Sequence, residues 1–169
     1  MIESKGGLIL AGKIAVKAGL GKIRSTLVKQ AANVIISLYG IMIEGKHCFE
    51  HIGEKRGSLF FQEAPGLPQV YAKETVRLYT EKMAANADEV IVQLRESTVQ
   101  IIRQAPLHGL RINGKRYIPV DIDTTAMDNS KTKKEGVGWT YKGFDGYHPI
   151  MAYVGNEGYL LDCELRPGS

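Results

Sequence analysis

Apolar residues recur with the helical period of about 3.6 residues through roughly the first two thirds of the chain. Between residues 8 and 28 this period predicts one or two short helices, broken near Gly19 and Gly21. Four further helices are predicted from the spacing of their apolar positions: 31–44, a short one between His47 and Gly57, one from Val70 through Met83, and one from about Asp88 to Gln104. A Pro/Gly loop at 64–68 separates the second of these four from the third.

The same spacing predicts which side chains face a core. The expected inward residues are Val34, Ile35, Leu38 and Met42, then Phe49 and Ile52, then Val76, Tyr79 and Met83, and finally Val90, Leu94, Ile101 and Ile102.

After Pro106 and Gly109 the period shortens to that of strands. Asn113-Gly114 predicts a two-residue turn of a small hairpin between Leu110–Ile112 and Lys115–Ile118. Longer extended segments are predicted at 117–123, 139–144, 148–154 and 158–165, with a polar loop over 128–138 and turns at Asp145-Gly146 and Gly155-Asn156. The pattern therefore predicts an α+β chain, with a helical region over 1–108 and antiparallel strands over 109–169.

The charge of the chain is concentrated in its first part. The net charge is +4, and residues 1–68 carry nine Lys/Arg against five Asp/Glu, while the remaining residues are balanced. This bias is compatible with contacts to phosphate and is also common on soluble proteins that bind no nucleic acid. The two cysteines, Cys48 and Cys163, lie far apart in sequence and form no CxxC or Cys/His ligand spacing. They are therefore expected to be reduced thiols of a cytoplasmic protein. No apolar stretch is long enough for a bilayer, and residues 1–5 lack the apolar core of a signal peptide, so a cytoplasmic location is expected.

Two carboxylates mark the first long strand. Asp121 and Asp123 stand at i and i+2, which places both on one face of a strand. Two buried acids would repel each other and lose hydration, and a divalent cation such as Mg²⁺ or Mn²⁺ relieves both costs. In the alternative reading, the segment is an ordinary strand end, with Asp123 capping a turn and Asp121 exposed to solvent.

The sequence around and after these acids contains several unusual blocks in order: DIDTT at 121–125, KKEG at 133–136, YKGFDGY at 141–147 and GYLLDCELRPGS at 158–169. Together they resemble the DDE transposases of bacterial insertion sequences, in the group named DDE domain group 1. Weaker similarity to the helical front of the same proteins lies at 7–10, 44–46, 49–58 and 73–77, so the resemblance covers nearly the whole chain.

The resemblance implies a metal-dependent nuclease with a ribonuclease H-like domain. Three acids and two metal ions would cut and join DNA at the terminal inverted repeats of a mobile element, with other transposase subunits as partners and the bacterial nucleoid as the location. Asp123 matches the first of the three acids, with Asp121 as a close second or supporting acid. The other two acids have no match here, because Asp145, Asp162 and Glu164 fall in the hairpin blocks. The resemblance thus implies an N-terminal fragment that is inactive alone, with strands whose apolar face and edges are open.

Basic side chains are weaker candidates for DNA contact. The lysines of the polar loop and the following segment would lie near the acidic strand and meet phosphates: Lys131, Lys133, Lys134 and Lys142. A solvated polar loop is the alternative, and the sequence slightly favours it. Arg77 would point toward a DNA groove if its helix read DNA, whereas an amphipathic helix of a packed bundle needs no such role. A second function class remains open: a DNA-binding or oligomerising fragment that inhibits full-length transposase by forming mixed complexes.

Overall fold

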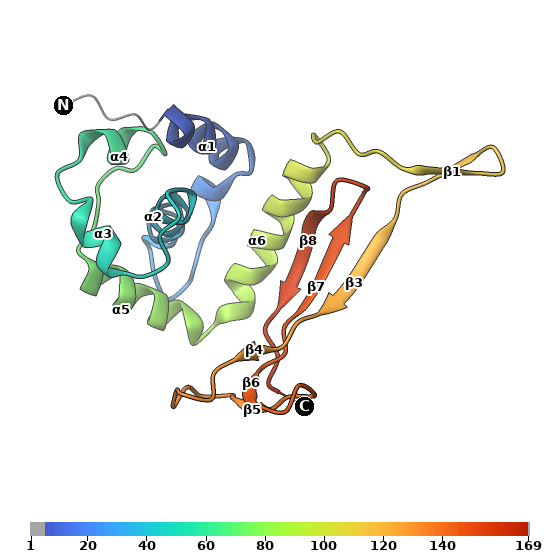
Figure 1. The fold of residues 1–169 in the computed structure, drawn as a ribbon. Coiled ribbons are helices and arrows are strands. Elements are labelled where there is room, and N and C mark those ends of the chain that lie inside the picture. Colours follow the sequence, from blue (N-terminus) through green and yellow to red (C-terminus); the bar gives the residue numbers. More distant parts are fainter. Residues whose placement is uncertain (1–5, 169) are drawn as a thin grey trace. The chain divides into compact units, whose positions relative to one another are not determined.

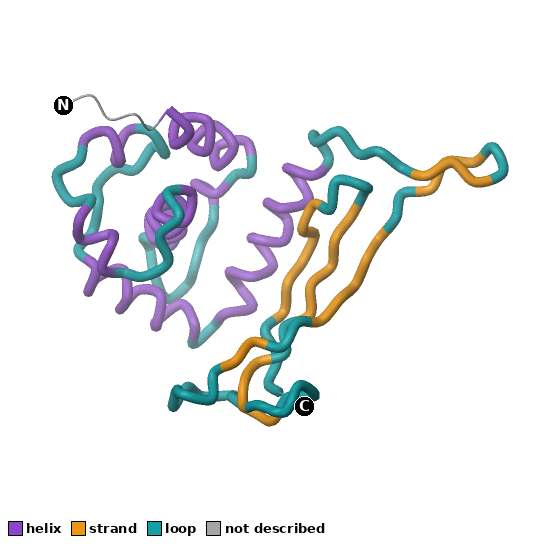
Figure 2. The backbone as a smooth tube through the Cα atoms, in the orientation of Figure 1, coloured by secondary structure: helices purple, strands orange, loops and turns teal. Residues whose placement is uncertain are grey.

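The computed structural model describes residues 6–168 of the chain. Helices occupy the described residues as far as Ile102, and all of the strands follow (Figures 1 and 2). The chain divides after Ile101 into two compact units, and each is described by itself below. This combination of helices with small antiparallel sheets is of the α+β kind predicted from the sequence.

The helical unit is built from short helices joined by tight connections. Its elements are α1 (Gly6–Lys17), the 3-10 turn η1 (Leu20–Lys22), α2 (Ala31–Ile43), α3 (Glu50–Glu54), α4 (Leu59–Glu63), α5 (Lys73–Ala84) and α6 (Ala87–Ile102). The break expected near Gly19 is present, with Gly19 in the left-handed region at φ 76°. Within the described residues, no helix combines the length and the apolar character that a bilayer span requires.

Helix α2 supplies much of the core of this unit. Val34, Ile41 and Ser37 on α2 are buried, and the hydroxyl of Ser37 donates to the Asn33 carbonyl at 2.8 Å. The predicted inward position of Met42 is wrong, since its side chain is 67% exposed. Helix α2 is apolar around most of its circumference, so the spacing of its residues does not single out one buried face.

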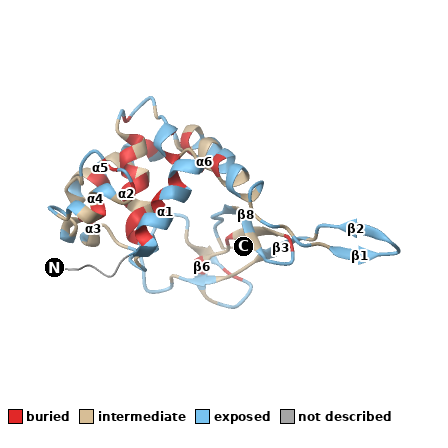
Figure 3. Cartoon of the chain, turned by 90° about the horizontal axis from the view of Figure 1, so that it is seen from above, coloured by how far each residue is buried: buried red, intermediate tan, exposed pale blue. Residues whose placement is uncertain are grey.

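The predictions of core-facing side chains on the other helices were also partly confirmed and partly wrong. Ile52, Val76, Met83 and Val90 are buried, as predicted, whereas Ile101 is exposed near the end of α6. Figure 3 shows the buried positions gathered on the helices.

Two features of the helical unit were not visible in the apolar pattern. Helix α4 is capped by the preceding residue, Ser58, whose hydroxyl accepts a hydrogen bond from the backbone N–H of Phe61 at 3.2 Å. Helix α1 also approaches the chain after α4 very closely at Gly12. A Cβ at this position would overlap the Ala64 carbonyl oxygen and lie 2.9 Å from its carbonyl carbon. Only glycine fits this approach.

The β unit contains three small antiparallel sheets. Its strands are β1 (Leu110–Ile112), β2 (Lys115–Tyr117), β3 (Val120–Thr124), β4 (Met127–Asp128), β5 (Gly138–Trp139), β6 (Asp145–Tyr147), β7 (Ile150–Val154) and β8 (Tyr159–Glu164). Strands β1 and β2 form a separate two-stranded ribbon, β3-β7-β8 form the longest sheet, and β4-β6-β5 form a short third sheet.

The predicted strand over 117–123 is divided in two. Tyr117 belongs to the ribbon, and β3 starts after Pro119, whose ring removes the backbone donor that a continuous ladder would need. The predicted hairpin turn is confirmed: Asn113 and Gly114 both have positive φ, 50° and 78°, as a two-residue hairpin turn of the type I′ class requires.

The short sheet also differs from the prediction. Asp145 and Gly146, expected in a turn, lie in β6, and the expected strand 139–144 is mostly a turn. That turn is closed at Phe144, whose carbonyl accepts from both the backbone N–H and the hydroxyl of Thr140 at 2.9 and 2.8 Å. The side chain of Thr140 is fully buried, so the hydroxyl cannot be satisfied by solvent and favours the turn instead.

Candidate functional site

Asp121 and Asp123 lie on β3, an edge strand of the sheet β3-β7-β8. Asp121 stands opposite Tyr153 of β7, and Asp123 stands opposite Met151. Directly opposed residues of an antiparallel pair share a face, so both acids share one face with Tyr153 and Met151. Alternate residues of a strand are about 6.6 Å apart along the chain, a span that one hydrated cation can bridge.

Both acids are exposed, whereas the predicted metal site assumed that they were buried. A carboxylate in contact with water has no desolvation cost that a cation must offset, so burial does not favour a cation at these two groups. The Asp123 carboxylate accepts a hydrogen bond from the backbone N–H of Thr124 at 2.7 Å, which orients it at the end of the strand. The case for a metal site therefore rests on their shared face and the sequence blocks around them.

The remaining acids of this sheet point elsewhere. Asp162 is opposite Ala152, and Glu164 is opposite Ile150, and these pairs share the face of Ile122 rather than that of Asp123. The third strand contributes Cys163 to the face of the two acids, opposite Met151. Across residues 6–168 no three His, Cys, Asp or Glu side chains come together in a group that would hold a metal ion.

The lysine-rich loop between β4 and β5 is ordered at its start by Asp128. The Asp128 carboxylate accepts from the Ser130 hydroxyl at 2.7 Å and from the Ser130 backbone N–H at 2.9 Å. These hydrogen bonds, together with the charge of Lys131, lower the pKa of Asp128 below its ordinary value. The side chains of the predicted phosphate contacts Lys131, Lys133 and Lys134 are exposed.

Two other predicted DNA contacts have partners within the protein. The ammonium of Lys142 lies 5.7 Å from the centre of the Tyr141 ring, a cation–π contact on an exposed turn. Arg77 of α5 forms an ion pair with Glu81 one turn later, at 3.2 Å, on the exposed side of the helix. Arg77 belongs to the helical unit, whereas the acids and lysines belong to the β unit.

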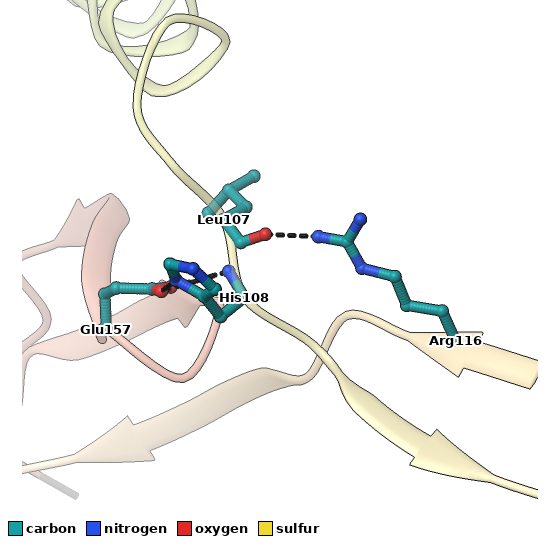
Figure 4. A network of polar contacts seen from close by, with 4 residues as sticks. All are labelled: Leu107, His108, Arg116 and Glu157. Carbon is teal, nitrogen blue, oxygen red and sulfur yellow. Dashed lines mark hydrogen bonds and ion pairs between the residues drawn. The ribbon is translucent and has the colours of Figure 1, made fainter.

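A polar network at the base of the ribbon was not predicted from the sequence. Glu157, in the turn between β7 and β8, accepts from the backbone N–H of His108 at 3.0 Å and also contacts its ring (Figure 4). Arg116 of β2 donates to the carbonyl of Leu107. Burial tends to raise the pKa of Glu157, but its hydrogen bonds with His108 outweigh this and lower it. The residues are 49 positions apart, so no local pattern indicates the pairing.

The helical unit has a hollow of its own, of about 580 Å³. Its lining is mixed in charge: Gly7, Leu8, Ile43, Glu44, Lys46, Glu54 and Lys55. Glu44 and Lys55 form a short ion pair of 2.5 Å whose side chains are only 9% and 13% exposed, and the Lys55 ammonium also lies 5.7 Å from the Phe61 ring centre. The charged lining residues are two acids and two lysines, so the lining has no net charge with which to attract a charged ligand.

No protein-family model, curated protein or solved structure matches this chain. The chemistry that Asp121 and Asp123 can support is therefore inferred from these residues themselves. Two carboxylates on one exposed strand face offer hard oxygen ligands, which suit Mg²⁺ or Mn²⁺, and Mg²⁺ commonly completes its shell with water and substrate phosphates.

Proposed function

We propose that this chain is the N-terminal part of a DDE transposase, which acts in DNA transposition by cutting and joining the ends of an insertion sequence. In this proposal the strands from β3 onward open a ribonuclease H-like catalytic domain. The DNA partner is the terminal inverted repeat of the element, and further transposase subunits complete the active assembly.

The observation that carries the proposal is the placement of Asp121 and Asp123. They lie on one face of an exposed edge strand, inside the DIDTT block that resembles the family's first acidic motif. Asp123 is the proposed triad acid, because it is followed by two threonines as in the motif, and Asp121 supports it. With Mg²⁺ or Mn²⁺ bound, such acids would help to activate a water or a DNA 3′-hydroxyl for attack on a phosphodiester.

The proposal includes low activity for the isolated chain. Asp162 and Glu164 lie on the opposite sheet face, so they do not complete a three-acid set with Asp123. Two carboxylates bind a divalent ion weakly without the phosphates of a substrate. Strand transfer by the pure chain is therefore not expected, and metal binding is the property to test.

Paramagnetic Mn²⁺ provides this test, since it broadens NMR signals only close to its site. We expect broadening to centre on the amides of 120–124 and on the facing residues of β7, at millimolar Mn²⁺. Asp121→Asn with Asp123→Asn should remove it. Asp145→Asn is the matched control, because Asp145 is also an exposed strand acid but falls outside the motif. Broadening that is uniform over all acids, or that survives the double substitution, would refute the metal site.

A second function has its own supporting observation. Residues 6–43 contain five basic side chains and no acid, and all five are exposed: Lys13, Lys17, Lys22, Arg24 and Lys29. Such a segment favours contact with DNA phosphates, and a fragment that binds DNA ends or joins mixed oligomers would inhibit full-length transposase.

Competition between DNA sequences separates this second function from simple charge attraction. The chain should bind an element-end duplex more tightly than a random duplex of the same length, with an affinity that falls as salt rises. Equal affinity for both duplexes, or no binding at low salt, would exclude recognition of the ends.

A further inference from the structure

The ribbon β1–β2 is exposed along its whole length. All six of its strand residues are exposed, and the ribbon extends away from the sheet β3-β7-β8 of the same unit (Figures 1 and 3). An isolated two-stranded hairpin is marginally stable in water, because it has no face to bury. A ribbon that contributes nothing to a core needs another reason for its sequence.

The two faces of the ribbon differ in chemistry. The register pairs Arg111 directly with Arg116, while the pairs on either side, Leu110 with Tyr117 and Ile112 with Lys115, point to the other face. One face thus consists of two arginines, and the other is mainly apolar with one lysine.

An arginine pair in this position is unfavourable for the protein alone. Directly opposed side chains have Cβ atoms about 4.5–5.5 Å apart, and like charges at this spacing repel. Arg116 uses one N–H to reach the Leu107 carbonyl, out of the five that a guanidinium carries. The guanidinium of Arg111 makes no hydrogen bond or ion pair within the described residues. An anion between the two guanidinium groups would turn their repulsion into attraction, and phosphate matches their planar donor geometry.

Both ends of the ribbon are fixed by one turn, the β7–β8 turn. Before β1, His108 donates its N–H to Glu157 at 3.0 Å, and its carbonyl accepts from Asn156 at 3.1 Å. After β2, the carbonyl of Pro119 accepts from Gly155 at 3.0 Å. These hydrogen bonds fix the orientation of the ribbon relative to the sheet that carries Asp121, and Figure 4 shows the contact of His108 with Glu157.

We infer that the Arg111/Arg116 face of the ribbon binds the phosphate backbone of duplex DNA. The segment 102–120 supports this by its charge, since it contains four basic residues, Arg103, Arg111, Lys115 and Arg116, and no acid. A two-stranded ribbon has the dimensions of an element that enters the major groove. Single-stranded DNA is disfavoured as the partner, because the arginine face carries no aromatic ring on which bases would stack.

The distance from the DNA contact at the ribbon to the bond that is cut rests on the proposed function, in which Asp121 and Asp123 mark the site of cutting. Arg116 and Asp121 are five residues apart, a reach of at most about 18 Å in extended chain. Even with the length of the side chains added, the gripped phosphates would lie within about one turn of the double helix, about 34 Å, of a phosphodiester at the acidic strand. The DNA binding itself does not depend on metal or on the acids.

The test is fluorescence anisotropy of the full chain with a labelled duplex of about 25 base pairs, in EDTA, over a series of salt concentrations. Arg111→Gln and Lys115→Gln are a matched pair, because each removes one positive charge from the same ribbon but from opposite faces. Each lost phosphate contact should lower the slope of log K against log salt by about 0.9 and weaken binding roughly eightfold at 0.1 M salt.

The expected result is this loss for Arg111→Gln, a slope change of about 1.8 for Arg111→Gln with Arg116→Gln, and a clearly smaller effect of Lys115→Gln. Asp121→Asn with Asp123→Asn should leave the affinity in EDTA undiminished, so failure of the metal site and failure of the ribbon give different results. Equal losses for Arg111→Gln and Lys115→Gln would overturn the assignment to one face. Three other results would each overturn the inference altogether. They are wild-type affinity of the double arginine variant, tighter binding to single strands or to double-stranded RNA, and a change in self-association alone. Circular dichroism checks that the variants keep their fold.

Discussion

Replacing Gly12 by alanine tests the closest approach in the helical unit. On an exposed helix, glycine to alanine stabilises by about 1 kcal/mol, because alanine has the higher helix propensity. At Gly12 the new methyl group would overlap the Ala64 carbonyl and lie 2.9 Å from its carbonyl carbon and 3.0 Å from the Cα of Pro65. These are backbone atoms, which cannot rotate away as a side chain would.

The magnitude follows from the distances. Ordinary contact of a Cβ begins near 3.4 Å, and the carbonyl oxygen is nearer than the carbonyl carbon, so α1 and the chain at Ala64 would have to separate by more than the half ångström (3.4 − 2.9) that the carbonyl carbon alone requires. Overpacking of this kind costs about 1–3 kcal/mol, and a radial gap of that size also loses about a quarter of each neighbouring dispersion contact. Because the separation exceeds half an ångström, the cost lies in the upper part of this range, about 2–3 kcal/mol, and subtraction of the propensity gain of about 1 kcal/mol leaves a net loss of about 1–2 kcal/mol.

The assay is urea unfolding followed by circular dichroism at 222 nm, which reports on the helices. With a slope of about 2 kcal/mol per molar urea, the middle of the range for small proteins, the midpoint for Gly12→Ala should fall by roughly 0.5–1 M. Gly7→Ala is the matched control on the same helix, because its Cβ would meet nothing within 4 Å, and it should leave the midpoint unchanged or raise it. A Gly12→Ala variant as stable as the wild type would show that α1 does not lie against Ala64.

Two further predictions concern charged groups. Lys55→Met should destabilise the helical unit by about 1.5–3 kcal/mol in urea unfolding, the range for a hydrogen bond to a charged group, since it removes the cation from a pair whose side chains are only 13% and 9% exposed, and a variant as stable as the wild type would mean that the pair is solvated. Ser130→Ala should raise the pKa of Asp128 toward its ordinary value, as measured by NMR titration of the carboxyl carbon. Because hydrogen bonds and Lys131 hold the folded pKa of Asp128 below the unfolded one, the stability it contributes is present above the unfolded pKa and is lost as pH falls through the folded one. An unchanged titration in Ser130→Ala would contradict this origin of the shift.

The sequence predicted helices best where one face is apolar and the other charged. Helices α5 and α6 have this pattern, and Val76, Met83 and Val90 are buried as expected. Helix α2 shows the limit, because nearly every position is apolar and the buried face is chosen by its neighbours. Helix α4 has only five residues, too few for a period to show, and its start depends on the cap at Ser58.

Short strands were predicted less well, for reasons of local hydrogen bonding. Asn113-Gly114 specified its turn by backbone chemistry alone, and that turn is present. Thr140 instead satisfies its hydroxyl within the chain and turns a segment whose alternation indicates a strand. The contact between His108 and Glu157 joins distant parts of the sequence, so it required the structure. Asp121 and Asp123 were correctly expected on one strand face, whereas their role stays a prediction.

The open edge of β3 has a consequence for how two copies of the chain would meet. Within the described residues, β3 pairs only with β7, so its other edge offers unsatisfied backbone groups to a strand from a second molecule, and Val120 and Ile122 are 55% and 67% exposed beside it. Asp121 and Asp123 work against such pairing, because their charges would face the same charges of the second copy. Neutralising them removes that protection. Aggregation should therefore increase in the asparagine variants, and light scattering is the control for every experiment that uses them.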